Sequence, residues 1–529
     1  MKLASTLMVQ GTASTVGKSL VVAGLCRIFA RDGWRVAPFK AQNMALNSFV
    51  TRAGGEIGRA QAMQAEAAGI EPTVEMNPIL LKPEGEMHSQ VIVLGRPLAS
   101  SEARAYYQQR NTLFPIVQHA LQRLREAYDL VIIEGAGSPV ELNLAHMDLV
   151  NMAVARLADA PVLLVGDIDR GGIFASLLGT LDLLAPEDRA RVKGLIVNKF
   201  RGDYSLWQAG ERLLAEKGGV PVLGTLPFVP DLRLAEEDSV ALDENTASIL
   251  QHSHQAHPEH LDIVVIRLPY LSNYDEFDAL AAEPMVQLHV VGSPEAFPQH
   301  PDLIILPGTK QTVHDLAWLW HRGLAQGIRS RVRHGSAVLG ICGGYQMLGE
   351  RVCDMVGAET APGTVEPGLQ LLPVETHFEP LAEKMTAQSI CQIAPAAQRG
   401  LFAQMQGLQF SGYQIHAGRT RASTAAAGTP AFQMEDGEKT SDGWLSADGW
   451  RAGCYVHGLF ENEPFRHRLL GALLQRRSPN GTLSRPGQFN RQADYDRWAG
   501  IVCQHLDLAQ LYACCHLHKQ EEKTAHWHP

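Results

Sequence analysis

The stretch Val338-Leu-Gly-Ile-Cys342-Gly-Gly-Tyr-Gln346-Met-Leu-Gly349 decides the fold of the C-terminal half of this chain. An apolar strand is predicted to stop at Cys342, two glycines follow, and a helical pattern then resumes. A tight turn between strand and helix would present the thiol beside the next backbone N–H and the positive end of the helix. That environment suits a thiolate nucleophile and the oxyanion it would generate.

A second informative stretch, Gly11-Thr-Ala-Ser-Thr-Val-Gly17-Lys18-Ser19, lies near the start of the chain. It follows an apolar strand and opens a helix, which is the context of a phosphate-binding P-loop. Its backbone N–H groups would converge on phosphate oxygens, Lys18 would reach the β- and γ-phosphates, and Ser19 would ligate Mg²⁺. The loop is one residue longer than the common form, as in the dethiobiotin-synthetase-like branch. A glycine-rich turn without a ligand is the competing interpretation.

The overall composition limits the classes of function. A net charge of −10 over 529 residues argues against a nucleic-acid partner. Eight scattered cysteines without a CxxC pair indicate reduced thiols. We find neither a signal peptide nor an apolar run long enough to span a bilayer, so we expect a cytoplasmic protein without a membrane partner.

The order of apolar and polar segments predicts an α/β protein of two domains. Residues 1–235 and 261–475 each alternate short strands with helical stretches, as βαβ units do. A polar, histidine-containing stretch at 236–260 is the linker candidate, and 476–529 form an extension with one helix at Asp494–Ala513. Ala394–Gly443 is expected to carry long loops. The predicted strands are Leu3–Val9, Arg35–Phe39, Leu130–Ile133, Val162–Val165, Leu195–Val197, Pro221–Leu223, Leu261–Leu268, Leu288–Val291, Leu303–Leu306 and Val338–Ile341.

Three further segments fit the nucleotide site, because each ends a predicted strand at the same sheet edge. Glu134 is placed to hold Mg²⁺ directly or through water. Asn198, with Lys199 beside it, is placed to read a purine edge. Asp167-Ile-Asp-Arg-Gly-Gly172 suits a phosphate or carboxylate contact, although a salt-bridged turn explains it nearly as well.

Cys342 needs a base and an oxyanion cradle. An unperturbed thiol titrates near ~8.5 and is mostly protonated at neutral pH. His457 follows an apolar strand and is the preferred general base, with His416 as the competing candidate. Backbone N–H groups of Gly308 and Gly343 can form the cradle, and the Gln346 amide could hold a glutamine substrate.

Together these motifs resemble the class I (triad) glutamine amidotransferases of the cobalamin branch. The segments Pro38–Ser48 and Met76–Pro83, with Asp167–Gly172 and Asn198–Gly202, narrow the resemblance to the cobyric acid synthase family. It covers nearly the whole chain, from about residue 3 to the tail helix. It implies a P-loop synthetase domain followed by a glutamine amidotransferase domain. The implied activity uses glutamine and ATP to amidate the b, d, e and g carboxylates of adenosylcobyrinic acid a,c-diamide.

The resemblance also assigns roles to residues. It implies that Cys342 is the nucleophile, that His457 is its partner, and that an adenosylated corrinoid is the acceptor. Substrate contacts are expected from Gln42 and Asn43, where relatives often have an aspartate, and from Lys82. Many relatives place a glutamate two residues after the histidine, but this chain has Leu459 there. Glu461 is a candidate for the third triad position, which stays open.

Three rival interpretations remain at this point. The nearest is a cobyrinic acid a,c-diamide synthase, which the Gln42-Asn43-Met44 loop disfavours. Another is a P-loop regulatory or partition ATPase with a non-catalytic glutaminase-like half, which Cys342 and His457 disfavour. The tail histidines suggest a cobalt ligand, although a tail without such a role is the more ordinary interpretation; they are His516, His518, His526 and His528.

Overall fold

A computed structural model describes residues 3–84, 88–102, 106, 109–230, 232–234, 260–423, 427–435, 440–478, 487 and 489–518. The chain divides into two compact units. Unit 1 comprises Met1–Ala45, Gly55–Asp238 and Asn490–Pro529, and unit 2 comprises Leu46–Gly54 and Ser239–Phe489. The predicted linker lies almost entirely outside the described residues, as do His526 and His528. Within the described ranges, no helix combines the length and apolarity that crossing a bilayer requires.

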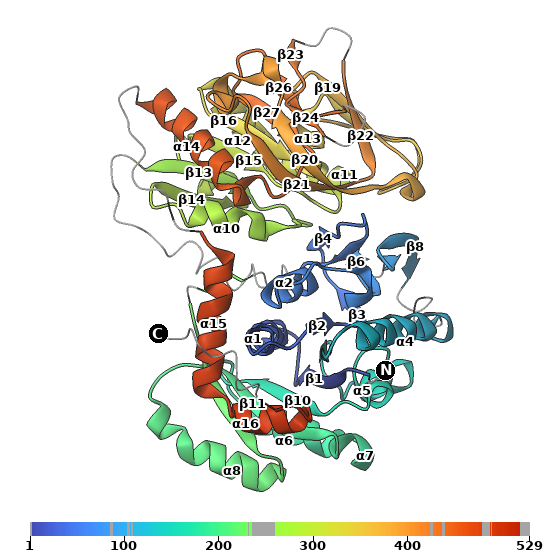
Figure 1. Cartoon of the computed structure of the whole chain (residues 1–529). Coiled ribbons are helices and arrows are strands. Elements are labelled where there is room, and N and C mark those ends of the chain that lie inside the picture. Colours follow the sequence, from blue (N-terminus) through green and yellow to red (C-terminus); the bar gives the residue numbers. More distant parts are fainter. Residues whose placement is uncertain are drawn as a thin grey trace. The chain divides into compact units, whose positions relative to one another are not determined.

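Unit 1 is built on a parallel sheet (Figure 1). Its described strands run in the order β12-β11-β10-β1-β9-β2. Their bounds are β1 Ser5–Gly11, β2 Val36–Phe39, β9 Leu130–Glu134, β10 Val162–Asp167, β11 Val192–Phe200 and β12 Val222–Pro227. A smaller sheet follows the order β3-β6-β7-β8, with bounds Gln42–Met44, Ile79–Pro83, His88–Val93 and Arg96–Glu102. The prediction of a P-loop parallel sheet is confirmed.

Alternate residues along these strands enter two different apolar cores, one on each face of the large sheet. Met8 and Ile133 pack with α4 and α6, whereas Leu7 and Ile132 pack with α1 and α15. This is the layered packing expected of βαβ units. The helices of unit 1 are α1 Lys18–Arg31, α2 Arg59–Ala67, α4 Arg110–Ala127, α5 Met152–Ala158, α6 Ile173–Leu183, α7 Pro186–Arg189, α8 Gln208–Gly218, α15 Arg491–His505 and α16 Leu508–Cys514.

The described part of the C-terminal extension contains two helices where one was predicted. α15 ends at His505, and Asp507 then caps α16 by accepting a hydrogen bond from the Gln510 N–H at 3.1 Å. An aspartate that satisfies a free N–H starts a new helix more readily than it continues an old one. Trp498 of α15 donates its indole N–H to the Leu20 carbonyl of α1 at 2.6 Å. The extension therefore packs on the helix that begins at the P-loop.

Unit 2 is built on a mixed sheet of order β14-β13-β15-β16-β27-β26-β23. The strands from β14 to β27 are parallel, and β26 and β23 are antiparallel additions. Their bounds are β13 Leu261–Ile266, β14 Val286–Val291, β15 Leu303–Leu306, β16 Ala337–Ile341, β23 Gly428–Thr429, β26 Trp444–Ser446 and β27 Arg451–Cys454. The longer helices are α11 Thr312–His321, α12 Leu324–Arg333, α13 Gly343–Leu348 and α14 Glu463–Arg477. The α/β prediction for this half is confirmed.

The expectation of long loops over Ala394–Gly443 was wrong. This stretch contributes to two four-stranded sheets, of order β21-β20-β24-β25 and β18-β17-β19-β22. Their bounds are β17 Arg351–Asp354, β18 Thr364–Pro367, β19 Val374–Phe378, β20 Met385–Ile393, β21 Gln409–His416, β22 Gly418–Ala422, β24 Phe432–Met434 and β25 Ser441–Asp442. The Ala, Gly and Gln content masks a strand pattern because partner strands, more than intrinsic propensity, decide whether such segments pair.

Candidate active site

Cys342 occupies a sharp turn between β16 and α13. Its backbone has φ 51° and ψ −112°, a strained conformation for a residue other than glycine. The turn is tightly packed, since a Cβ at Gly344 would lie 2.0 Å from the Leu306 carbonyl oxygen. The thiol donates a hydrogen bond to the Ile415 carbonyl at 3.3 Å. The predicted strand-to-helix elbow is therefore present, and Cys342 is 7% exposed.

His457 lies three residues beyond the end of β27, the strand that pairs in parallel with β16. It is buried, and its ring hydrogen-bonds the Cys342 side chain. His457 Nδ1 lies 3.1 Å from Glu276 Oε1. A carboxylate can only accept here, so Nδ1 carries the proton and Nε2 is left for exchange with the thiol. Cys342, His457 and Glu276 thus lie in contact and form a candidate catalytic constellation of this unit.

Sequence reasoning missed Glu276. It belongs to the short 3₁₀ helix η4, Tyr274–Phe277, which follows β13, and its second oxygen accepts the Gly458 N–H at 3.2 Å. The candidate Glu461 is exposed, at the end of η9, Leu459–Glu461. Glu276 and His457 are 181 positions apart in sequence. Only the sheet order, which brings the carboxyl ends of β13 and β27 to one edge, could have suggested the pair.

The environment of His457 favours its charged form. Burial opposes the charge, but the Glu276 carboxylate and the Cys342 side chain outweigh it and raise the pKa of His457 to about 10. His416, the competing candidate, behaves in the opposite way. Burial lowers the pKa of His416 to about 3, and its Nδ1 lies 2.8 Å from the Gly418 carbonyl. His416 also stacks on Tyr455, with ring centroids 3.6 Å apart.

The predicted oxyanion turn lies beside the same residues. A Cβ at Gly308 would lie 2.9 Å from His457 Cε1, and a Cβ at Gly343 would lie 3.2 Å from the Thr309 N–H nitrogen. Both glycines therefore stand where a larger residue would not fit. Gln346 has internal partners: its Oε1 accepts the Thr312 hydroxyl at 2.8 Å and its Nε2 donates to the Tyr455 hydroxyl at 3.3 Å. Its assignment to the glutamine substrate stays a prediction.

The P-loop of unit 1 runs from β1 to the N-terminus of α1. Thr15 and Gly17 have φ values of 60° and 96°, which curl the backbone around a concave centre. Lys18 folds back on this loop, donating to the Ala13 carbonyl at 2.9 Å and the Gly137 carbonyl at 3.3 Å. Asn198 donates to the Val16 carbonyl at 2.8 Å and so supports the loop. Its predicted reading of a purine stays untested.

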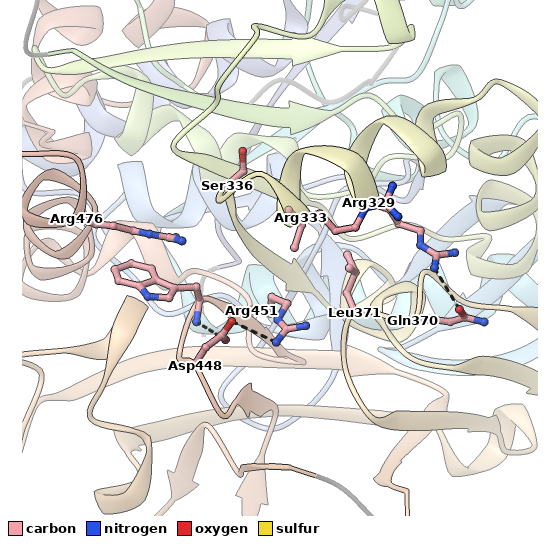
Figure 2. A pocket seen from close by; sticks show the side chains of 10 residues that line it. Arg329, Arg333, Ser336, Gln370, Leu371, Asp448, Arg451 and Arg476 are labelled. Atoms are coloured by element: carbon pink, nitrogen blue, oxygen red, sulfur yellow. Dashed lines mark hydrogen bonds and ion pairs between the residues drawn. The ribbon is translucent and has the colours of Figure 1, made fainter.

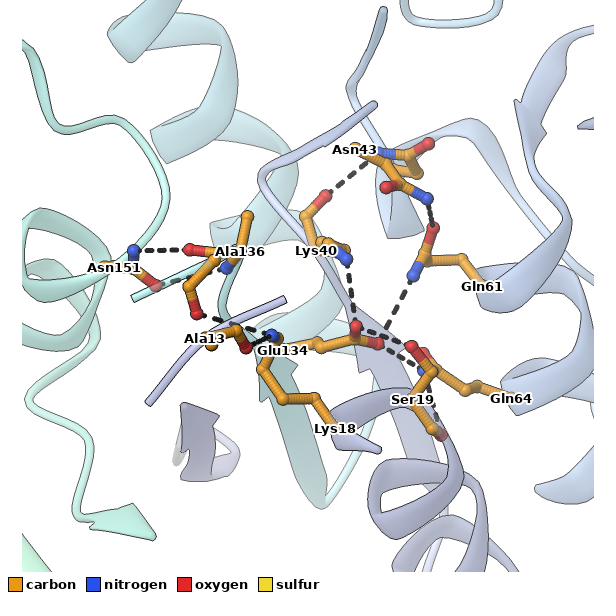
Figure 3. Close-up of polar contacts among 12 residues, drawn as sticks. Ala13, Lys18, Ser19, Lys40, Asn43, Gln61, Gln64, Glu134, Ala136 and Asn151 are labelled. Atoms are coloured by element: carbon orange, nitrogen blue, oxygen red, sulfur yellow. Dashed lines mark hydrogen bonds and ion pairs between the residues drawn. The ribbon is translucent and has the colours of Figure 1, made fainter. Parts of the chain in front are cut away.

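Figure 3 shows the polar contacts around Glu134, which ends β9. Its carboxylate accepts the Ser19 hydroxyl at 2.8 Å and the Lys40 ammonium at 2.9 Å, and Gln64 also donates to it. Burial alone would raise the pKa of Glu134, but the Lys40 cation and these hydrogen bonds lower it. The carboxylate is thus kept ionised beside the Ser19 hydroxyl.

These oxygens fit a magnesium ion. Mg²⁺ prefers hard oxygen donors, and the Ser19 hydroxyl and Glu134 carboxylate lie together at the end of the P-loop. Within the described residues, Gln64 Oε1 is also buried without a hydrogen-bond partner. No grouping of three or more His, Cys, Asp or Glu that could hold a metal occurs among the described residues. The tail histidines that are described, His516 and His518, are not in such a group.

The residues predicted to contact the acceptor are held by neighbours in unit 1. The Gln42 side chain accepts the Tyr106 hydroxyl at 2.6 Å, and Asn43 donates to Gln61 at 2.9 Å. Lys82 forms a buried ion pair with Glu56 at 2.7 Å, so its charge is already balanced. Gln42 and Asn43 lie on β3 and Lys82 on the neighbouring β6, so the three share one small sheet. Their contact with a substrate stays a prediction.

A pocket of about 320 Å³ lies in unit 2 (Figure 2). Ser336, directly before β16, and Arg451, which begins β27, line it, whereas Cys342 follows the other end of β16. None of the predicted site residues lines this pocket. Two of the arginines that line it have internal partners: Arg451 pairs with Asp448, and Arg476 lies over the Trp450 ring. We therefore place the chemistry at the carboxyl edge of the sheet.

Comparison with known proteins gives consistent matches to both halves. Residues 7–241 match the model of the CobQ/CobB/MinD/ParA nucleotide binding domain, and residues 262–465 match that of the CobB/CobQ-like glutamine amidotransferase domain. A cobyric acid synthase of Sorangium cellulosum is 50% identical over 518 residues, covering 96% of this chain and 98% of the relative. One from Dehalococcoides mccartyi is 48% identical over 514 residues, with coverages of 96% and 98%.

Proposed function

The chain belongs to the cobyric acid synthase family, and we propose that it catalyses the reaction of that family. It uses glutamine and ATP to convert the b, d, e and g side-chain carboxylates of adenosylcobyrinic acid a,c-diamide to amides, which gives cobyric acid. The observation that carries this proposal is the Cys342–His457–Glu276 constellation, in a chain that also has a P-loop with Ser19 and Glu134 in contact.

In the glutaminase reaction, His457 Nε2 takes the proton of the Cys342 thiol, and the sulfur attacks the carboxamide carbon of glutamine. A C–S bond forms, and the carbonyl oxygen takes up charge beside the backbone N–H groups of the Gly308 turn and Gly343. His457, held by Glu276, gives its Nε2 proton to the nitrogen as the C–N bond breaks. Ammonia leaves, and water attacks the remaining thioester to release glutamate and restore the thiol.

In the synthetase reaction, a corrinoid carboxylate oxygen attacks the γ-phosphorus of ATP, and ADP leaves. The carboxylate is a poor electrophile until this acyl phosphate forms. Ammonia then attacks the acyl carbon, the C–O bond to phosphate breaks, and an amide remains. Lys18, which contacts the P-loop backbone at Ala13, would offset phosphate charge. Ser19 and Glu134 would hold Mg²⁺, which supplies further charge neutralisation on the phosphates.

The direct experiment counts the amides added to the corrinoid. The protein is incubated with adenosylcobyrinic acid a,c-diamide, Mg-ATP and glutamine carrying an isotopic label in the amide nitrogen, and the product is analysed by mass spectrometry. We expect four labelled amides per corrinoid. Two amides added to cobyrinic acid, with none on the diamide, would instead identify a cobyrinic acid a,c-diamide synthase.

The division of labour is tested with Cys342→Ala. Because only the first half-reaction uses the thiol, this variant should lose glutamine-dependent amidation and keep amidation supported by added ammonium salt. Rates of glutamate release and of amide formation are measured side by side on the same preparation. Loss of amidation with both glutamine and ammonium, with an unchanged circular dichroism spectrum, would contradict the proposal. No glutamate release from the wild-type protein would also contradict it.

A further inference from the structure

One short piece of the N-terminal sequence, Leu46–Gly54, belongs to the compact glutaminase unit. It contains strand β4, Ser48–Val50. We propose that this segment positions the catalytic His457–Glu276 pair, and that Asn47 and Phe49 are positioning residues for glutamine hydrolysis. This inference rests on the proposed glutaminase activity and adds residues that no part of the reaction chemistry required.

Asn47 holds the start of the helix that carries Glu276. Its side-chain oxygen accepts the Asn273 backbone N–H at 2.7 Å, and the Ser48 N–H donates to the Asn273 side-chain oxygen at 2.9 Å. Asn273 has φ 55° and directly precedes η4, whose third residue is Glu276. A left-handed residue keeps that backbone only when its surroundings fix it. Asn47 and Asn273 are 1% and 3% exposed, so this reciprocal pair is shielded from competing water.

Phe49 supports the other partner of the pair. Its ring packs against Tyr413, with centroids 5.3 Å apart, and Tyr413 stacks on the His457 imidazole at 5.4 Å with an interplanar angle of 18°. Backbone hydrogen bonds in both directions, at 2.8 and 3.3 Å, tie Tyr413 to His457. Phe49 thus packs against Tyr413, whose ring lies nearly parallel to the His457 imidazole.

The segment is itself anchored to β20, next to the strand that carries Tyr413. Thr386 donates to the Gly54 carbonyl at 2.7 Å, and Gln388 donates to the Val50 carbonyl at 2.8 Å. Val50 shares a small apolar cluster with Tyr413 and Ile415, and the Ile415 carbonyl accepts the Cys342 thiol proton. Residues 46–54 therefore contact residues that hold the Glu276 carboxylate, the His457 imidazole and the Cys342 thiol.

The test compares Asn47→Ala and Phe49→Leu with the wild type in two assays on the full-length protein. Displacing a catalytic group by about 1 Å can cost about a hundredfold in rate, so we expect kcat for glutamate release to fall by roughly tenfold to a hundredfold. KM for glutamine should change little, and ammonium-supported amidation should stay at the wild-type rate. Arg52→Ala, an exposed position in the same segment, is the matched control and should change neither assay.

Two readouts separate positioning from a general packing defect. Asn47→Asp keeps the accepting oxygen and should recover much of the rate that Asn47→Ala loses. A looser Glu276 holds the His457 proton less tightly, so the alkaline limb of the kcat profile should move to lower pH in Asn47→Ala. Wild-type glutamate release in both Asn47→Ala and Phe49→Leu would overturn the inference, as would a slower rate with an unmoved pH profile.

The test remains decisive if one of the two variants does not fold. If Asn47→Ala is insoluble, Phe49→Leu alone carries the test, because it keeps an apolar side chain and removes only the ring. Failure of this inference is also distinct from failure of the proposed function. A wild-type protein that releases no glutamate refutes the function, whereas an active wild type with equally active variants refutes only the positioning role.

Discussion

At the scale of single residues, the proposed glutaminase chemistry depends on a proton carried by the His457 ring, which lies between Glu276 and Cys342. The raised pKa of His457 favours the imidazolium form at neutral pH. It can therefore protonate departing ammonia throughout the neutral range. The buried Glu276 carboxylate is the group that maintains this charge against the cost of burial.

Glu276→Gln tests this arrangement. The variant removes the negative charge but keeps the shape of the side chain, so burial then dominates and the pKa of His457 falls. Since the proton is lost at a lower pH, the alkaline limb of glutaminase kcat should shift toward neutrality. The rate should drop by about a hundredfold or more, as when a triad carboxylate is replaced by its amide. The measurement is glutamate release across a pH series.

Glu461→Gln is the matched control for that substitution. Glu461 is an exposed carboxylate close to His457 in sequence, and it was the candidate that the sequence offered. It should leave both the rate and the pH profile unchanged. Equal effects of the two substitutions would show that Glu276 has no special role.

Whether a residue's place in the site could be predicted depended on how far away its partners lie along the sequence. The turns that present Cys342, Lys18 and Ser19 were predictable because their neighbours in sequence form them. Glu276 was not, because its partner lies on another strand. The internal bonds of Gln346 and the ion pair of Lys82 were equally hidden, since Tyr455 and Glu56 give no local signal.

At the scale of elements, both sites occupy the carboxyl ends of parallel strands. β1 and β9 deliver the P-loop and Glu134, while β16 and β27 deliver Cys342 and His457. This is where open α/β sheets place their ligands, because the loops of neighbouring strands converge there. The sequence predicted apolar strands at these places and a helix after the P-loop, where α1, Lys18–Arg31, is found. It did not predict β20 to β25, because short strands depend on partners that only the folded chain supplies.

The P-loop element should serve only one of the two half-reactions. Lys18→Ala removes the cation nearest the expected phosphates, so amide formation should fall by about a hundredfold or more with either glutamine or ammonium as nitrogen source. Glutamate release should continue. Lys193→Ala removes an exposed lysine from β11 and is the control. The assay is amide formation alongside glutamate release. Undiminished amide formation in Lys18→Ala would contradict the assignment of this loop.

At the scale of the whole molecule, each compact unit is completed by a piece of chain from far away in sequence. Unit 1 receives α15 and α16 from the C-terminus, and unit 2 receives residues 46–54 from the N-terminal part. Composition shifts placed the general division near the polar stretch at 236–260, but they carried no sign of these exchanges. Both exchanged pieces pack through ordinary apolar and polar side chains, which look the same in sequence whichever unit they join.

The docking of α15 should contribute measurably to the stability of unit 1. Trp498 is 2% exposed and packs against Gly24, where an added Cβ would lie 2.9 Å from its ring nitrogen. Trp498→Ala should lower the free energy of unfolding by about 3–5 kcal/mol. Gln504→Ala on the exposed side of α15 should have little effect. Urea denaturation followed by circular dichroism measures both. Equal stabilities of the two variants would show that the helix is not a structural part of this unit.

The location of residues 46–54 limits how this gene can be divided in evolution. A break near the middle of the coding sequence would leave the downstream product without the peptide that contacts Asn273 and Tyr413. After such a fission, the downstream protein would need another segment to replace residues 46–54, or would have to bind that peptide from the separate N-terminal protein. We therefore expect the glutaminase unit to be inherited on the same polypeptide as the synthetase unit that uses its ammonia.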